Sequence, residues 1–520
     1  MPVEVFVKAA TMTSKDAAGG GSSSITSYLN FLYANGTNAD VRDGVAFVAD
    51  NSVAFVAGRH VAAHNLESKE MSFFLEGGSV EEVTYICVAP NMRNLAVCER
   101  HSADVPPQVS VFVVATEKKI RSLQHPDVSS SMQFVSASFS ADSKTLVTLC
   151  GDPSWTLMLW NWMQSKVLAS VRIGQPIARM SVSPMDSSQI ITSGPGILKL
   201  WRFQETSIKG VSLLSGKNAS LSLRGHAWGP KEQVLAYSDS GEVLLLESTE
   251  LKATFRIPTQ NKGVSSVLFT SNLIIAASLS GQLLVYEKRT RDKSEDGNPY
   301  ALSKTLLYSE TCNIQSMSVN VSEDTLVCYT SDRQVVTMSL TALESIKDHT
   351  DPFKRICGGF HSDTVTGVDV CLRKPLVATA SMDRSVRLWN FADKCCEVDK
   401  SFLDEVLSVA IHPSGFHVLL GFSDKLRLYN VCCNDLRQFK EFAVKGCKLV
   451  KFSNGGHLFA AVNLSNILVY NTYTGMNTHL THSQLRKFVF FFFFAAFFFC
   501  LHTCQILCDC VFLLRFIIRF

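Results

Sequence analysis

The sequence predicts an all-β protein, a β-propeller in which four-stranded sheets stack as blades around an axis. Aromatic residues that close each repeat recur about every 40 residues: Trp160 and Trp201 are 41 residues apart, Trp389 and Tyr429 are 40 apart, and Tyr429 and Tyr470 are 41 apart. Between them lie short runs of valine, leucine and isoleucine, separated by Ser-Asp, Ser-Gly or Asp-Arg turns. A repeat of this length with a Trp-Asp-like end is typical of a propeller blade, which buries its faces only by stacking on neighbouring blades.

The clearest repeat spans residues 361–390 and ends at a Trp-Asn pair. Its residues His361, Ser381, Asp383 and Trp389 stand where WD-repeat proteins place a hydrogen-bonded tetrad. We expect Asp383 to accept from the imidazole of His361 and the ring to bridge to Ser381. The indole N–H of Trp389 would donate within the same network while its ring is buried. These side chains are expected to hold a blade together and to have no catalytic role.

Seven repeats precede residue 342, and three more follow. We therefore predict a seven-bladed WD40-type propeller over residues 28–345 and a partial second propeller of about three blades over residues 346–482. Residues 1–27 are expected to be flexible because they contain the run Gly-Gly-Gly-Ser-Ser-Ser. The expected blade-closing anchors outside the tetrad are Trp160, Trp201, Tyr286, Tyr429 and Tyr470.

The composition up to residue 485 is typical of a cytoplasmic protein and indicates no particular class of partner. The formal net charge is +3 and 18% of residues are charged, so bulk charge indicates neither a nucleic-acid partner nor an acidic one. The 16 cysteines are scattered through strand-like segments, which favours buried thiols in a reducing compartment over disulfides. The first residues contain no apolar run long enough for a signal peptide.

The composition changes abruptly over residues 483–520. Twelve of the 34 phenylalanines fall within the last 33 positions, and residues 488–499 read FVFFFFFAAFFF. One interpretation is a transmembrane helix over residues 488–507, interrupted by His502, Thr503 and Gln505. The other is a translated intron, because a polypyrimidine tract read in frame gives runs of Phe, Leu and Cys. The sequence leaves both interpretations open.

Motifs for catalysis or for cofactor binding are absent from the sequence. There is no G-x-x-x-x-G-K-[ST], no H-E-x-x-H and no G-x-S-x-G. Cys395-Cys396 and Cys432-Cys433 are adjacent pairs, whose side chains point to opposite faces of a strand and do not converge on zinc. We therefore predict no catalytic residue, no cofactor and no metal. An enzyme would need titratable residues that converge on blade loops, and the sequence indicates no such set outside the tetrad.

The run VTGVDVCLRKPLVATASMDRSVRLWNF, residues 365–391, resembles the cilia- and flagella-associated protein 57 family, which are WD-repeat proteins of motile cilia. Residues 408–430 and the segment SADSKTLVTLCGDPSWTLMLWNW support the resemblance, which covers residues 40–482. The resemblance implies a scaffold of the axoneme that binds tubulin in doublet microtubules and helps to dock or regulate inner dynein arms. Family members carry two propellers followed by coiled coils.

This chain departs from the family plan, because its second propeller stops after three blades and no heptad region follows. Both features are expected of a truncated gene model. The alternative function is a membrane-anchored WD40 scaffold that uses residues 488–507. The charged segment 288–300 is a solvated loop in one interpretation and a contact for acidic tubulin tails in the other.

Overall fold

A computed structural model gives the fold of the chain. It describes residues 4–11, 27–38, 40–74, 80–101, 105–124, 133–204, 207–214, 220–247, 249–257, 263–271, 273–288, 300–341, 343, 352–463 and 466–476. These residues form two compact units. One unit is Gly36–Ile356, and the other combines Met1–Asn35 with Cys357–Phe520.

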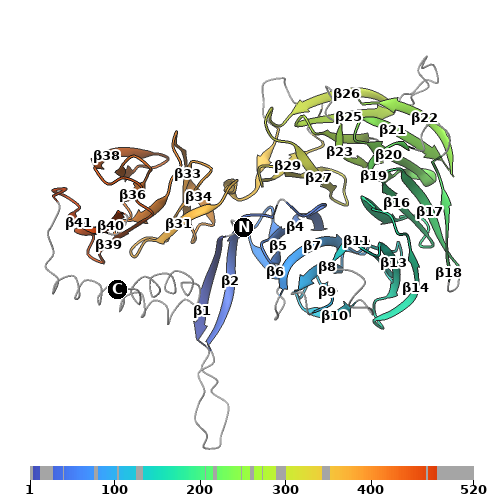
Figure 1. Ribbon diagram of the computed structural model, residues 1–520, viewed down its shortest axis with the longest axis horizontal. Helices are drawn as coiled ribbons and strands as arrows, with labels where there is room; N and C mark the ends of the chain where they lie inside the picture. Colours follow the sequence, from blue (N-terminus) through green and yellow to red (C-terminus); the bar gives the residue numbers. More distant parts are fainter. Residues whose placement is uncertain are drawn as a thin grey trace, which may run out of the picture. The chain divides into compact units, whose positions relative to one another are not determined.

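The first unit consists of seven antiparallel four-stranded sheets that follow one another along the chain (Figure 1). In chain order they are β3–β6 (Val45–Ala49, Ser52–Ala57, His60–Asn65, Met71–Phe74), β7–β10 (Val80–Val88, Asn94–His101, Gln108–Val113, Lys119–Gln124), β11–β14 (Phe134–Phe139, Leu146–Cys150, Thr156–Asn161, Lys166–Arg172), β15–β18 (Arg179–Val182, Gln189–Gly194, Ile197–Gln204, Ser207–Ser212), β19–β22 (Leu223–Trp228, Gln233–Ser238, Glu242–Glu247, Glu250–Arg256), β23–β26 (Val264–Phe269, Leu273–Ser278, Gln282–Lys288, Tyr300–Leu307) and β27–β30 (Ile314–Val319, Thr325–Thr330, Val335–Ser339, Lys354–Arg355).

The first strands of these sheets pack against one another and close the ring. Strand β3 packs against β7, the contacts continue from sheet to sheet, and β27 of the seventh sheet packs against β3. Within each sheet the strands follow in chain order, so the fourth strand lies at the outer edge. This is the topology of a closed seven-bladed propeller, which has no exposed end face to stabilise.

Burial follows from position within a blade. The second and third strands have neighbouring blades on both faces, so they are almost wholly apolar: every residue of β12 is buried. Most of the fourth strands expose residues at the rim, as in β18, where all residues but one are exposed. The core is therefore a series of apolar layers between successive blades, such as the layer of Leu149, Leu157 and Ile190 between the third and fourth blades.

The second unit contains three further sheets. They are β31–β34 (Val365–Val370, Leu376–Ser381, Ser385–Asn390, Cys395–Ser401), β35–β38 (Ser408–Ile411, His417–Gly421, Leu426–Val431, Leu436–Phe442) and the three-stranded sheet β39–β41 (Leu449–Phe452, Leu458–Asn463, Asn466–Asn471). Their first strands pack in the order β31, β35, β39. The predicted fold class is confirmed: an all-β propeller of seven blades is followed by three blades of a second one.

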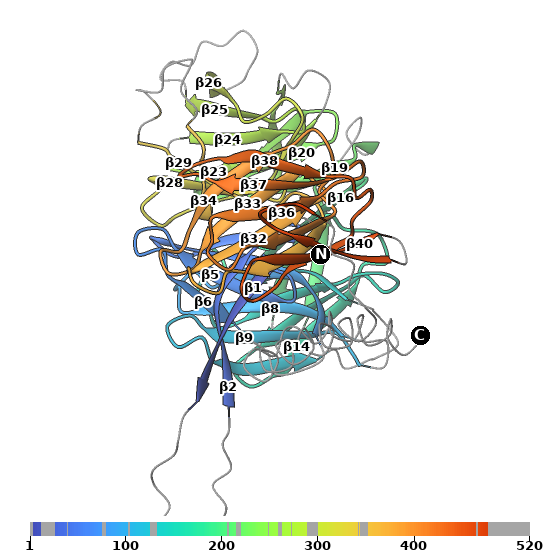
Figure 2. The ribbon, with the colours of Figure 1, turned by 90° about the vertical axis from the view of Figure 1, so that its left-hand side faces the viewer.

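The N-terminal segment differs from the expectation of a flexible chain. Residues Glu4–Thr11 form β1, which pairs antiparallel with β2, Ser27–Asn35, and Figure 2 shows the two strands side by side. The consecutive β-branched and aromatic residues Val5, Phe6 and Val7 favour a strand. Tyr33 at the end of β2 is buried, and its hydroxyl donates to the backbone carbonyl of Lys394 at 3.3 Å. The Gly-Ser run at residues 19–24 lies outside the described residues.

The ends of the predicted domains also need two corrections. The fourth strand of the seventh blade, β30, is supplied by Lys354–Arg355, so this blade extends past residue 345. Residues 28–35 group with the second unit and not with the first propeller. Among the described residues no helix is long and apolar enough to cross a membrane, and the stretch 488–507 lies outside them.

Candidate functional site

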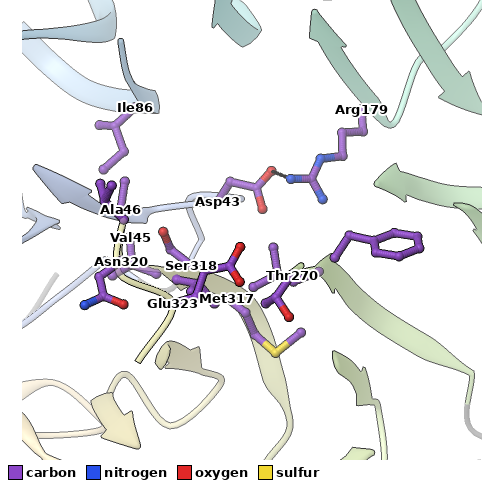
Figure 3. Close-up of a pocket in the computed structure, with 14 residues that line it drawn as sticks. Asp43, Val45, Ala46, Ile86, Arg179, Thr270, Met317, Ser318, Asn320 and Glu323 are labelled. Atoms are coloured by element: carbon purple, nitrogen blue, oxygen red, sulfur yellow. Dashed lines mark ion pairs between the residues drawn. The ribbon is translucent and has the colours of Figure 1, made fainter. Parts of the chain in front are cut away.

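The candidate site is a cavity of about 470 Å³ at the centre of the first ring. Its walls come from the first strands of five different blades and from the turns beside them (Figure 3). The residues that line it are Asp43, Val45, Ala46, Ile86, Arg179, Leu268, Phe269, Thr270, Met317, Ser318, Val319, Asn320, Val321 and Glu323. Ring closure alone brings these residues together, because their strands are far apart in the sequence.

An ion pair crosses one side of the cavity. Nη2 of Arg179, the first residue of β15, lies 3.5 Å from Oδ2 of Asp43, which precedes β3 (Figure 3). Two buried tyrosines hold the pair: the hydroxyl of Tyr85 donates to Oδ2 of Asp43 at 3.3 Å, and Nη1 of Arg179 donates to the hydroxyl of Tyr237 at 3.5 Å. The pair therefore links the first, second, fourth and fifth blades.

The positive charge of Arg179 is fixed at all physiological pH values. Burial disfavours the charged guanidinium, but Asp43 and then Tyr237 and Tyr85 outweigh this effect, so the pKa of Arg179 is raised. The pKa of Tyr85 is raised as well, first by burial and then by the neighbouring Asp43. A fixed cation thus faces the cavity, and Tyr85 remains a neutral hydrogen-bond donor.

The opposite wall is polar and joins the sixth and seventh blades. The carboxylate of Glu323 accepts from the backbone N–H of Ser271 at 3.0 Å and from its hydroxyl at 2.5 Å. The amide of Asn320, which is buried, donates to Asp324 at 2.6 Å and shapes the turn that carries Glu323. Thr270 and Ser318 add hydroxyl groups to this wall (Figure 3).

The lining of the cavity has the chemistry to accept a polar group, and its described residues form no catalytic arrangement. It offers one cation, two carboxylates and several hydroxyls around an apolar wall, which suits a side chain or backbone segment of a protein partner. None of its lining residues is a cysteine or histidine, and no described cluster of three or more His, Cys, Asp or Glu residues is placed to hold a metal ion.

The tetrad of the eighth blade forms with one change of member. Nδ1 of His361 lies 3.0 Å from Asp383, and Nε2 lies 2.8 Å from the hydroxyl of Thr379. The indole N–H of Trp389 donates to the same hydroxyl at 2.9 Å. Burial lowers the pKa of His361 despite the opposing effect of Asp383, so the imidazole is neutral. The bonds hold the blade together, and Ser385 adds a hydroxyl 2.9 Å from Nδ1.

Ser381 was expected beneath the imidazole, and this expectation is corrected. Its hydroxyl donates to the backbone carbonyl of Asp363 at 3.1 Å and accepts from the backbone N–H of Asp383 at 3.1 Å. Thr379 replaces it because residues two apart on a strand share a face. Trp389 pairs across the sheet with Val377, so Thr379 is its diagonal neighbour, and Ser381 lies two residues farther along the strand. Ser381 lies at the strand end and instead fixes the turn that carries Asp383.

The expected blade-closing anchors fall into two groups. Trp160 and Trp201 donate their indole N–H to Thr148 and Thr192, each at 2.9 Å, which repeats the Trp389–Thr379 bond in two other blades. In the sixth, ninth and tenth blades a tyrosine stands in the place of the Trp. Tyr286 and Tyr429 are buried, and Tyr470 is half-buried.

Sequence reasoning missed the cavity residues. Arg179 was the available signal, since it is the charged residue in the otherwise apolar start of a first strand, IARMSV. A charge at that position predicts a partner near the ring axis, but the sequence does not identify Asp43 as the partner. That pairing depends on ring closure.

Comparison with known proteins supports the WD-repeat assignment. The family model "WD domain, G-beta repeat" matches residues 355–390. Cilia- and flagella-associated protein 57 of Mus musculus is 30% identical over 510 residues, which cover 88% of this chain and 40% of the mouse protein. Cilia- and flagella-associated protein 57 A of Tetrahymena thermophila is 30% identical over 367 residues, covering 67% of this chain and 28% of that protein.

A third relative carries a different name. Echinoderm microtubule-associated protein-like elp-1 of Caenorhabditis elegans is 21% identical over 457 residues, covering 81% of this chain and 49% of that protein. The chain thus spans less than half of each of these three relatives. The resemblance to cilia- and flagella-associated protein 57 is confirmed, and the relatives point to a cilia-associated WD-repeat protein.

Proposed function

We propose that this relative of cilia- and flagella-associated protein 57 is a non-enzymatic adaptor of motile cilia. It binds the doublet microtubules of the axoneme and helps to dock or regulate inner dynein arms. The observation that carries the proposal is a closed seven-bladed ring in a chain that aligns over 88% of its length with a cilia- and flagella-associated protein. The Caenorhabditis elegans relative is named as a microtubule-associated protein-like protein, which supports a microtubule partner.

The ring supports an adaptor role because it presents many loops on a rigid frame. Buried layers between blades fix the frame, and the loops and the cavity are free to carry contacts. The Arg179–Asp43 pair gives the cavity a fixed polar feature that a partner's side chain can recognise. Partner selection at such a site comes from hydrogen bonds and charge, and no chemistry on the partner is required.

The test is localisation of the tagged chain in a ciliated cell, followed by detergent extraction. Retention on the extracted axoneme supports the proposal. Release with the soluble fraction contradicts an axonemal adaptor, and release with detergent-solubilised membrane would favour the alternative of a membrane-anchored scaffold that uses residues 488–507. A cavity variant, Arg179→Met with Asp43→Asn, tests whether the cavity contributes to retention.

A further inference from the structure

The outer strands of the first ring carry charge of almost one sign. Six of them, β10, β14, β18, β22, β26 and β30, form the rim of the second to seventh blades (Figure 1). Together they hold ten basic residues and a single acidic one, Glu250. The basic residues are Lys119, Arg121, Lys166, Arg172, Lys209, Lys252, Arg256, Lys304, Lys354 and Arg355. We call this set the basic belt.

Most of the belt is available to solvent. Lys119 and Lys304 are half-buried, and the other eight basic residues are exposed. Lys252 pairs with Glu250 at 3.3 Å, and Lys304 donates to the backbone carbonyl of Leu343. The remaining exposed cations present their charge at the rim.

Protection of sheet edges explains part of this pattern but not its sign. Charged side chains, lysine above all, keep an exposed edge strand from pairing with another chain. The outer strands of the second unit, β34 and β38, occupy the same position in their blades. They hold three basic and three acidic residues, so mixed charge protects these edges equally well. Edge protection therefore leaves the nearly uniform positive charge of the first ring unexplained.

Contacts between blades make the belt continuous at its densest part. Nε of Arg121 on β10 donates to the backbone carbonyl of Met163 at 2.9 Å, in the turn that leads to Lys166 on β14. Lys118 and Lys119 precede Arg121 along the same edge. Glu117, in the turn before them, is the acidic residue of this region of the rim. Lys118, Lys119, Arg121 and Lys166, from two blades, thus lie along one stretch of the rim.

We infer that the basic belt binds an acidic, glutamate-rich peptide segment of a partner protein. The inference rests on the proposed function, because it names the chemistry by which the ring would hold a microtubule surface that carries acidic tails. A flexible glutamate-rich segment fits because single exposed ion pairs are weak and only several together give useful affinity. Such binding must weaken as salt is raised, since exposed charges are screened.

The test uses the full chain and a fluorescent 20-residue polyglutamate peptide, with binding followed by anisotropy at 50 mM and 200 mM salt. The belt variant is Lys166→Glu, Arg172→Glu, Lys209→Glu, all exposed on outer strands. The matched control is Arg437→Glu, Lys445→Glu, Lys448→Glu in the second unit, which changes net charge equally at exposed positions. Circular dichroism checks that both fold.

The belt variant should bind the peptide at least about tenfold more weakly, and the control should lose less than about threefold. Equal losses in both variants, or no binding by the unaltered chain, would overturn the inference. A duplex DNA of equal charge that binds more tightly than the peptide, with the same dependence on the belt, would also overturn it in favour of nucleic acid.

Co-sedimentation with microtubules separates this inference from the proposed function. Microtubules from which protease has removed the acidic tails should retain less of the unaltered chain, and the belt variant should not respond to tail removal. If the chain binds tail-less microtubules fully, the proposed function stands and the inference fails. If the chain binds polyglutamate but is absent from the axoneme, the inference stands and the proposed function fails.

Discussion

The hydroxyl of Thr379 lies 2.8 Å from Nε2 of His361 and connects the imidazole to the indole of Trp389. The indole N–H donates to this hydroxyl, which leaves the hydroxyl proton for Nε2. Nδ1–H can then donate to Asp383 at 3.0 Å. The chain of bonds satisfies each buried polar group in turn, which a low-dielectric interior requires.

Thr379→Val should therefore destabilise the eighth blade by about 1–3 kcal/mol, because the isosteric change leaves Nε2 of His361 and the indole N–H buried without their shared partner. Hydrogen–deuterium exchange of residues 376–390 measures the loss. Thr379→Ser keeps the hydroxyl and should exchange nearly as slowly as the unaltered chain. If both variants exchange equally fast, the lost methyl packing and not the hydroxyl is responsible.

The sequence was enough to predict this blade and three members of its tetrad, but the predicted hydroxyl, that of Ser381, was wrong. Thr379 and Ser381 lie on the same face of β32, two residues apart, so alternation does not distinguish them. What decides between them is the depth at which the side chains of Trp389 and His361 enter the blade. This depth depends on how the neighbouring side chains pack, and the periodicity of the sequence carries no information about that packing.

The repeat period was enough to predict the number of blades, because each blade is a local unit of the chain. The central cavity was not predictable in the same way. Asp43 and Arg179 are 136 residues apart, and they meet only because seven similar blades close into a ring. The strand Glu4–Thr11 was also missed, because the neighbouring Gly-Ser run dominated the composition of that segment.

Glu99 gives a pH-dependent prediction for the second blade. Its carboxylate is buried and accepts from Gln108 at 3.0 Å and Ser110 at 2.8 Å, and His101 lies 3.8 Å away. Burial raises its pKa from 4.5 to about 7, although the two hydrogen bonds oppose the shift. Between these pH values the folded chain holds a proton that the unfolded chain has released. The contribution of Glu99 to the free energy of unfolding is therefore full below pH 4.5 and is lost as the pH rises through 7.

Glu99→Gln removes this titration while it keeps the shape of the side chain. At pH 8 the variant should be more stable than the unaltered chain by up to about 3 kcal/mol, and the difference should vanish near pH 4.5. Urea unfolding of both proteins at several pH values measures this difference in stability. Other groups titrate equally in the two proteins, so their effects cancel in the difference. A difference that stays constant with pH would contradict the prediction.

Gly210 makes room for an indole on the fourth blade. It lies on β18 opposite Trp201, and a Cβ at this position would lie 2.6 Å from two ring atoms of Trp201. Gly210→Ala should therefore displace the ring, weaken the Trp201–Thr192 hydrogen bond and cost about 1–3 kcal/mol. Thermal unfolding measures the cost, and Val211→Ala at the adjacent exposed position is the control. Equal melting temperatures for the two variants would show that the ring has space to move.

The last prediction concerns the Asp43–Arg179 pair. Substitution of either residue leaves the charge of the other without its partner. Arg179→Met removes the cation and leaves the Asp43 carboxylate with Tyr85, while Asp43→Asn leaves a partly buried guanidinium without its counter-charge. Each single change should cost about 1–3 kcal/mol, and the double variant should cost less than the sum of the two. Urea unfolding of the four proteins completes the cycle.

The same cycle has a second readout in a neighbouring blade. Burial lowers the pKa of His226 far below its ordinary value, and the Arg179 cation lowers it further. Its ring nitrogens lie 2.6 Å from the hydroxyl of Ser181 and 2.7 Å from that of Ser193, so it is held in place when Arg179 changes. Arg179→Met should therefore raise the pKa of His226, as measured by NMR titration, and Asp43→Asn should not. Additive stability costs together with an unchanged His226 pKa would mean that the pair is too weakly coupled to organise the cavity.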